Sequence, residues 1–120
     1  MAGVVHVPWY ATGFRHDKLA AALADISAVS LRYGALSYRV YRYRDDRYKF
    51  LQTVEMLSKE AWEDFWYGPE FVEMRALTQS WYQVPVLYGW TDLVAEGGLD
   101  AEGATVGAPA TGDEVGDLPA

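Results

Sequence analysis

The stretch Ser58–Trp90, SKEAWEDFWYGPEFVEMRALTQSWYQVPVLYGW, decides the fold of this 120-residue chain. Ser58 is a typical N-cap residue, and apolar side chains follow it at helical spacing. Gly68-Pro69 interrupts this pattern, and proline is favoured in the first turn of a new helix. The stretch therefore predicts two consecutive helices, a loop, and a closing strand over 84–93.

Four further elements precede this stretch. The short apolar run 4–10 ends at a turn signal and predicts a strand. Apolar residues recur at helical spacing over 15–33, and Gly34 is a suitable helix stop. Segment 36–56 predicts two strands around Asp45-Asp46. The order β-α-β-β-α-β is typical of an α+β, ferredoxin-like fold, a four-stranded antiparallel sheet with both helices on one face.

The turn at Asp45-Asp46 also predicts how the two hairpin strands pair. If the chain reverses between these two residues, Tyr43 faces Tyr48 and Tyr41 faces Phe50. Those four rings would then form an aromatic ladder on one face of the hairpin. Because aromatic and aliphatic residues occupy both hairpin faces, the sheet face without helices needs a cover. We therefore expect a homodimer through that face.

The net charge of -7 belongs mainly to the C-terminal segment 96–120, which holds six of the seventeen acidic residues and no aromatic or basic one. Its Gly, Ala and Pro content predicts a disordered tail, because it has little apolar surface to bury. The domain itself is expected over 1–95. The tail is either a solubilising segment or a docking peptide for a protein partner, through Val115 and Leu118.

Composition excludes several classes of site and partner. The chain has no cysteine, which excludes disulfides and thiolate metal ligands, and its two histidines argue against a metal site. No apolar run approaches the roughly 20 residues that span a bilayer. The N-terminus also lacks the pattern of a signal peptide. We expect a cytoplasmic protein with no membrane and no nucleic-acid partner, since the near-neutral body and the glycine-free third strand differ from RNA-recognition domains.

The order of elements, the segments SKEAWEDFW and GPEF, and the late strand YQVPVLYGW resemble the antibiotic-biosynthesis-monooxygenase family of dimeric α/β-barrel proteins, over roughly 3–95. The resemblance implies a homodimer whose two sheets pack into a barrel. It also implies a ligand cleft between sheet and helices in each subunit. Members include cofactor-independent oxygenases of aromatic phenols and quinols, haem-opening enzymes, and proteins without an established reaction, so the fold does not settle the chemistry.

The haem-opening branch of that family can be compared residue by residue. Its long helix carries a Trp and, further along, the His that ligates iron. The matching positions here are Phe65 and Arg75. Trp66 is one step from the expected Trp and points about 100° away on a helix. Since an arginine side chain stays protonated, it cannot ligate iron, and the resemblance argues against haem degradation.

Seven residues form the candidate site. An oxygenase without metal or cofactor needs a base, a cation or donor for the substrate anion, and an apolar box that excludes water. We predict His6 as the base and Arg75 as the anion partner. The box and its mouth would be formed by Trp62, Phe65, Trp66, Phe71 and Tyr82.

Each of these residues also has a purely structural interpretation. The helix aromatics would be core, His6 would be hydrogen-bonded in the sheet, and Arg75 would pair with an acid of its own helix or with the helix dipole. The first hypothesis is thus a homodimeric monooxygenase-like protein that binds a small aromatic molecule and oxidises it without a cofactor. The alternative is a non-catalytic, dimeric ligand-binding or scaffold member of the family, whose cleft is filled by Trp62 and Trp66 and whose acidic tail docks a partner.

Overall fold

The computed structural model describes residues 2–99 and 105–106 of the chain. Four strands and three α-helices make up its body, with short 3-10 turns, η1 and η2, after α1 and α3. In chain order the elements are β1 (Gly3–Tyr10), α1 (His16–Val29), η1 (Ser30–Tyr33), β2 (Ala35–Arg42), β3 (Lys49–Met56), α2 (Lys59–Trp66), α3 (Pro69–Thr78), η2 (Gln79–Trp81) and β4 (Gly89–Thr91).

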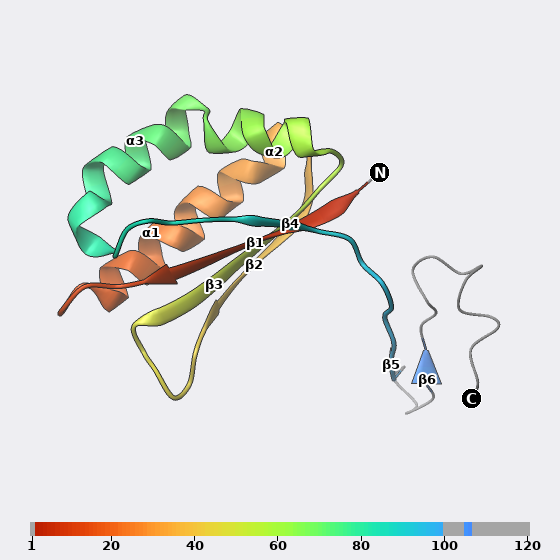
Figure 1. Ribbon diagram of the computed structural model, residues 1–120, viewed down its shortest axis with the longest axis horizontal. Coiled ribbons are helices and arrows are strands. Elements are labelled where there is room, and N and C mark those ends of the chain that lie inside the picture. Colours follow the sequence, from red (N-terminus) through yellow and green to blue (C-terminus); the bar gives the residue numbers. More distant parts are fainter. Residues whose placement is uncertain (1, 100–104, 107–120) are drawn as a thin grey trace.

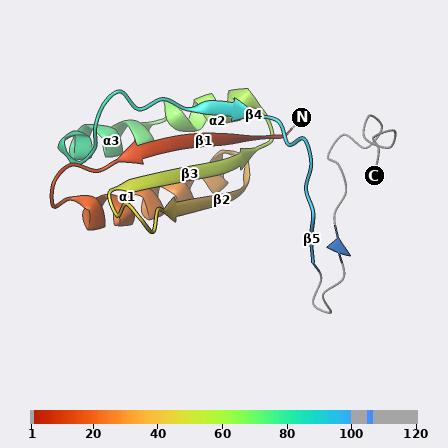
Figure 2. The same cartoon turned by 60° about the horizontal axis from the view of Figure 1, so that its bottom comes forward.

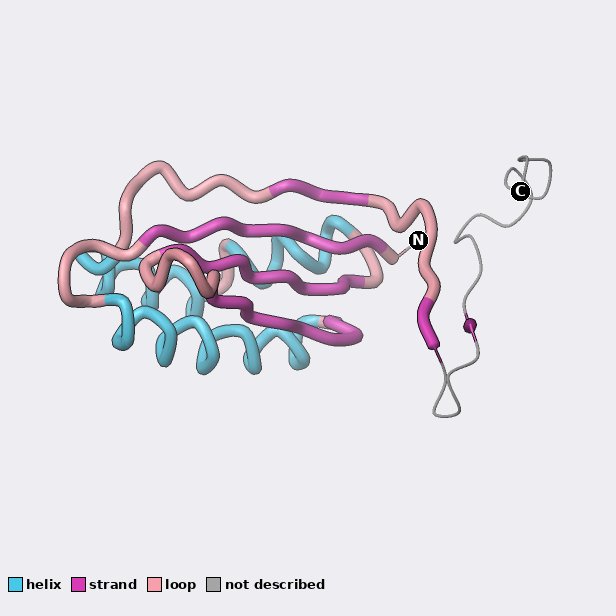
Figure 3. The backbone as a smooth tube through the Cα atoms, turned by 90° about the horizontal axis from the view of Figure 1, so that it is seen from below, coloured by secondary structure: helices cyan, strands magenta, loops and turns pink. Residues whose placement is uncertain are grey.

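The strands form one antiparallel sheet in the order β2-β3-β1-β4. All three helices cover the same face of this sheet, and among the described residues no helix or strand covers the opposite face (Figures 1 and 2). Figure 3 looks onto the sheet and shows its strands side by side, whereas Figure 1 shows the helices on one side of the strands. This arrangement confirms the predicted α+β, ferredoxin-like fold.

The core lies between the sheet and the helices. Alternate residues of β1, namely Val5, Val7 and Trp9, are at most 2% exposed. Leu19 and Leu23 of α1 pack above them and are fully buried. The strand period of two and the helical period of about 3.6 therefore place their apolar faces against each other, as the sequence pattern predicts.

The predicted helix signals are present in the structure. Ser58 Oγ accepts a hydrogen bond from the Ala61 backbone N–H at 3.1 Å, which caps α2. Gly34 has a φ of 96°, the left-handed conformation that favours glycine after a helix. The backbone of Gly68 is extended, which separates α2 from α3, and a Cβ atom there would lie 2.6 Å from the Asp64 carbonyl oxygen, so this close approach requires glycine. Among the described residues no helix combines the length and the apolarity needed to cross a membrane.

The predicted hairpin register is wrong by one residue. Tyr41 pairs with Leu51 and Arg42 pairs with Phe50, so Tyr41 and Phe50 lie on opposite faces and the predicted ladder does not form. The turn is longer than predicted: Tyr43 N–H bonds Lys49 O at 3.0 Å, and Lys49 N–H bonds Asp46 O at 3.0 Å. A one-residue slip moves every side chain of a strand to the other face.

The predicted closing strand over 84–93 is also too long, because only Gly89–Thr91 is a strand. Ala11 pairs with Tyr82, whereas His6 pairs with Gly89, so the segment between these contacts does not keep one register with β1. Pro85 lies in this segment and has no backbone N–H to donate.

The predicted disordered tail over 96–120 lies mostly outside the described residues. Two short pieces of it are described. Gly98–Leu99 (β5) and Thr105–Val106 (β6) form an antiparallel pair of strands. β5 lies beyond the end of the main sheet (Figure 1). The docking residues Val115 and Leu118 fall outside the described residues.

Candidate functional site

The predicted aromatic box is a packed cluster between the sheet and helices α2 and α3. Trp62, Phe65 and Phe71 are fully buried, and Trp66 is 7% exposed. The ring centroids of Trp62 and Trp66 lie 5.6 Å apart in a stacked arrangement, and those of Phe65 and Phe71 lie 4.9 Å apart. The side chains therefore fill the space that an open cleft would occupy, and a ligand can reach only the edge of the cluster.

Arg75 of α3 lies at that edge. Its guanidinium carbon is 4.0 Å from the centre of the Trp66 ring and 4.8 Å from that of Phe71. Its Nη2 donates to the Trp66 backbone oxygen at 2.7 Å, so Arg75 binds the last turn of α2. Burial lowers the pKa of Arg75, and the nearby phenol groups of Tyr82 and Tyr67 act in the opposite direction.

The second terminal nitrogen of Arg75, Nη1, is buried and has no hydrogen-bond partner among the described residues. The Nε1 of Trp62, in the same cluster, is buried without a partner as well. A buried donor left unpaired costs about 1–3 kcal/mol. The cluster therefore holds one cationic and one neutral N–H group without an acceptor among the described residues, and of the two Arg75 is the one at the edge, since Trp62 is fully buried.

Tyr82 closes the other side of the cluster. Its hydroxyl donates to the Arg75 backbone oxygen at 3.2 Å, and its ring meets the Trp9 ring edge-on with centroids 4.9 Å apart. Burial raises the pKa of the Tyr82 phenol, so the group stays protonated near neutral pH and does not serve as a base. Tyr82 is thus an anchor between α3 and β1.

His6 does not lie with the other six predicted residues. It pairs with Thr53 and Gly89 in the sheet, and its strand neighbours Val5 and Val7 point to the helices. Because side chains alternate along a strand, His6 projects from the sheet face that carries no helix. The structure therefore separates the predicted base from Arg75 by the thickness of the sheet, and the expectation that both touch one cleft is wrong.

Two residues of the cluster were missed by the sequence analysis. Trp9 stacks on Phe71 with centroids 6.2 Å apart, and Tyr88 meets Trp62 and Trp66 at 5.4 and 5.3 Å. The alternation of β1, which puts Trp9 on the side of Val5 and Val7, could have indicated the first. Tyr88 lies in the irregular segment before β4, where no periodicity marks the buried side.

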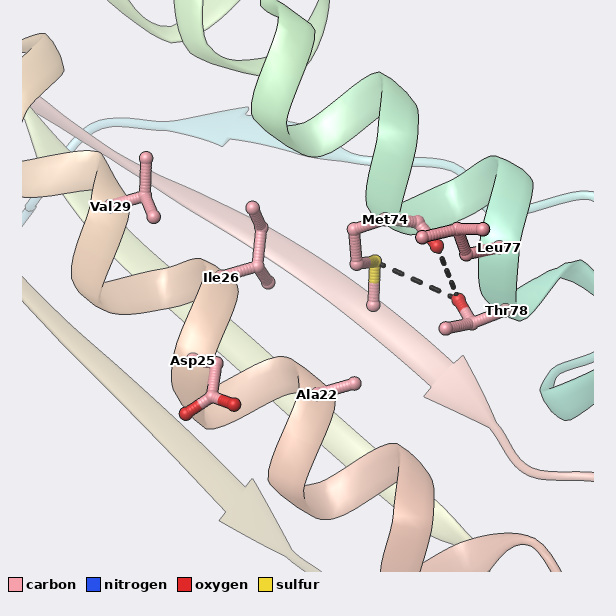
Figure 4. A pocket seen from close by; sticks show the side chains of 7 residues that line it. All are labelled: Ala22, Asp25, Ile26, Val29, Met74, Leu77 and Thr78. Atoms are coloured by element: carbon pink, nitrogen blue, oxygen red, sulfur yellow. Dashed lines mark hydrogen bonds between the residues drawn. The ribbon is translucent and has the colours of Figure 1, made fainter.

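A separate surface groove of about 290 Å³ lies between α1 and α3 (Figure 4). Ile26 and Val29 of α1 point toward α3, and Met74, Leu77 and Thr78 face them from α3. The Thr78 hydroxyl donates to the Met74 backbone oxygen at 2.7 Å. This groove is lined by other residues than the predicted site. Within residues 2–99 and 105–106 no group of three or more His, Asp or Glu side chains is placed to hold a metal ion.

No protein-family model matches this sequence, and no curated protein matches it. Several solved structures share its fold. SnoaB, a cofactor-independent oxygenase from Streptomyces nogalater, is 13% identical with a TM-score of 0.64, over 74% of this chain and 89% of SnoaB. Rv0793 from Mycobacterium tuberculosis is 18% identical with a TM-score of 0.69, and the match covers 80% of this chain and 98% of Rv0793.

A third structure, described as an antibiotic biosynthesis monooxygenase, is 13% identical with a TM-score of 0.67 and covers 77% of this chain and 97% of its own. The matches span nearly the whole of these proteins, and their low identity means that they establish architecture and not activity. The chain therefore has the fold of the antibiotic-biosynthesis-monooxygenase type of structure.

Proposed function

We propose that this chain forms a homodimer through the open face of its sheet and binds a small aromatic molecule of the phenol or quinol class at Arg75. Support for the dimer comes from the composition of that face. Tyr41 is 50% exposed on it, with the partly buried Leu51 and the exposed Pro8 in the neighbouring strands at the same level. An apolar patch of this kind is typical of a protein–protein contact.

The observation that supports ligand binding is the unpaired Nη1 of Arg75 beside the rings of Trp66 and Phe71. A planar cation next to aromatic rings suits an aromatic anion, since the guanidinium pairs with the oxygen and the rings pack on the ligand. The phenolate oxygen would accept the hydrogen bond that Nη1 does not make within the described residues. A neutral aromatic hydrocarbon would gain only the packing.

The packing favours binding without catalysis. Trp62 and Trp66 fill the interior, as expected for the non-catalytic alternative, and His6 lies on the other face of the sheet. Oxidation of the bound molecule is the second candidate function. It is favoured by the position of Arg75, because a cation that stabilises a phenolate raises the share of the electron-rich form that reacts with O2. In that reaction a ring C–H carbon of the phenol becomes a quinone carbonyl with one oxygen atom of O2, and the other oxygen leaves as water with the two hydrogens that the substrate loses, so the substrate supplies all four electrons.

Calorimetric titration with 1-naphthol and with its methyl ether tests the proposed binding. We expect naphthol to bind more tightly, because the ether cannot ionise. Arg75→Met should weaken naphthol binding roughly tenfold to hundredfold, the range of a charged hydrogen bond. Arg32→Met is the matched control, since Arg32 pairs with Glu70 at 3.0 Å on the surface. Equal affinities for the two ligands, or equal effects of the two variants, would refute the site.

Two further measurements separate the parts of the proposal. Light scattering should show an assembly of at least twice the 13.4 kDa chain mass, and Leu51→Glu should reduce it. Leu31→Glu changes an exposed leucine of η1 and is the control for the dimer test.

Oxygen uptake tests the catalytic candidate. Uptake with a naphthalene quinol that exceeds the uncatalysed oxidation, and that is lost in Arg75→Met, would establish catalysis. Binding of the quinol without oxygen uptake would leave ligand binding without catalysis as the function.

A further inference from the structure

The groove between α1 and α3 continues along the outer edge of α1. A second hollow, of about 450 Å³, shares Ala22 and Asp25 with the groove of about 290 Å³ and extends it to Trp81. Apolar side chains line most of this surface, including Leu77, which is 74% exposed. The combined groove, here called the α1 groove, follows much of the 14 residues of α1, a length of about 21 Å.

Two opposite charges lie on the α1 groove. Lys18 and Asp25 stand seven positions apart, close to two helical turns, and therefore lie on one side of α1. Neither takes part in an ion pair within the described part of the chain. The Nζ of Lys18 lies 5.8 Å from the centre of the Trp81 ring, at one end of the groove.

We propose that the α1 groove is a contact between two copies of this chain, with α1 packed antiparallel against α1 of the second copy. In a twofold contact, a residue that meets another across the interface is met by it in return. Lys18 of each copy then pairs with Asp25 of the other. The midpoint between them falls at Ala21 and Ala22, whose short side chains allow helix axes about 8 Å apart.

Charge distinguishes a second copy from other occupants. The acidic segment after Ala95 would place carboxylates against Asp25, and a basic peptide would place cations against Lys18. Only a partner with both signs at the same spacing satisfies both residues, and the same helix in reverse direction has that pattern. Helix α1, whose residues line the α1 groove, lies in the layer of helices and not on the open face of the sheet (Figure 2), so this contact is independent of the proposed sheet dimer.

Charge reversal and charge exchange test the proposal in the full-length chain by sedimentation velocity at low salt. Lys18→Glu and Asp25→Lys should each weaken the contact at least roughly tenfold, because each creates two like-charged pairs. The double variant Lys18→Glu/Asp25→Lys restores both pairs and should recover the wild-type assembly. Leu77→Glu should also weaken the contact, and adding the charge exchange Lys18→Glu/Asp25→Lys to it should not restore the assembly. Unchanged thermal melts show that these exposed substitutions leave the fold intact.

The sheet variant Leu51→Glu separates this contact from the sheet dimer. The wild-type protein should reach about four times the 13.4 kDa chain mass, and Leu51→Glu should reach about twice that mass. The double variant Lys18→Glu/Leu51→Glu should be a single chain. If the sheet dimer is wrong, Leu51→Glu leaves the mass unchanged and Lys18→Glu alone yields a single chain. The α1 contact would be overturned if Leu51→Glu were a single chain. It would also be overturned if Lys18→Glu/Asp25→Lys did not restore the wild-type assembly mass.

Discussion

The two faces of the sheet are built from the same strands and yet differ in almost every property. On the helix face, Val7 and Phe50 are at most 1% exposed and belong to the hydrophobic core. On the open face, adjacent positions carry His6, Tyr41 and Arg39, which contact no helix. The difference shows that neighbours in sequence can belong to separate sites. A base on one face cannot serve a cation on the other.

The helix face also carries a fully buried polar residue. Gln52 is fully buried, yet its Oε1 accepts from Trp9 Nε1 at 3.1 Å and its Nε2 donates to Ser27 Oγ at 2.9 Å. This chain of bonds ties β1, β3 and α1 together through the core. A buried amide with both ends paired costs little, whereas either partner left alone would be unsatisfied.

The largest predicted difference between the faces comes from removing an aromatic ring. Trp62→Ala should lower the free energy of unfolding by about 3–5 kcal/mol, because the ring is fully buried and leaves a cavity. Tyr41→Ala on the open face should cost less than about 1 kcal/mol at low protein concentration. Urea unfolding followed by circular dichroism measures both. Similar losses of unfolding free energy in the two variants would contradict the conclusion that one sheet face is buried and the other open.

Two adjacent residues of β3 provide a finer comparison. Gln52→Ala should cost about 2–4 kcal/mol, since Trp9 Nε1 and Ser27 Oγ lose their partner and a cavity forms. Thr53→Ala, which changes the open face, should cost about 1 kcal/mol or less. The same urea titrations give both values. A larger loss at Thr53 would contradict the assignment of the two side chains to opposite faces.

Glycines on the two faces should respond to alanine in opposite ways. A Cβ atom at Gly3 would lie 2.7 Å from Trp90 Cζ2 and 2.9 Å from the Thr91 carbonyl oxygen, and Gly3→Ala should cost about 1–3 kcal/mol. At Gly89 nothing lies within 4 Å, and its φ is not positive, so Gly89→Ala should be neutral or stabilising by up to about 1 kcal/mol. Thermal melts of the two variants check this difference.

The smallest effect concerns pH and the helix layer. The hydrogen bond from the Tyr33 hydroxyl lowers the pKa of Glu70 below its ordinary 4.5, with Arg32 in support. A carboxyl whose folded pKa is depressed stabilises the protein above its unfolded pKa, and this contribution disappears as pH falls through the folded value. Tyr33→Phe should therefore reduce stability at pH 7 and flatten its loss below pH 4.5. Parallel curves for the two proteins would contradict the coupling.

The order of elements could be predicted because its signals are local. Ser58, Gly68-Pro69 and Gly34 act through the backbone of a few neighbouring residues, and each ends or begins a helix where the sequence indicates. The helical spacing of the aromatic side chains in α2 likewise indicated which side of that helix is buried. Their composition also suggested a box, and the structure shows that these rings pack on one another instead.

The register and the faces could not be predicted from local signals. The Asp45-Asp46 turn allows more than one pairing, and the observed shift of one residue reverses the positions of Tyr41 and Phe50. The irregular segment before β4 likewise hid Tyr88, which packs on Trp62 only because the chain is carried back along β1.

By itself, the sequence determined the βαββαβ order, the helix ends and the apolar positions of α2, because these follow from hydrophobic period and backbone preference over short spans. The tertiary structure alone decided that His6 and Arg75 lie on opposite sides of the sheet, and that Arg75 Nη1 is buried without a partner among the described residues. Such facts depend on strand pairing between distant segments. Pairing is set by the turn geometry together with the strand face that the core buries, and the turn residues alone do not indicate it.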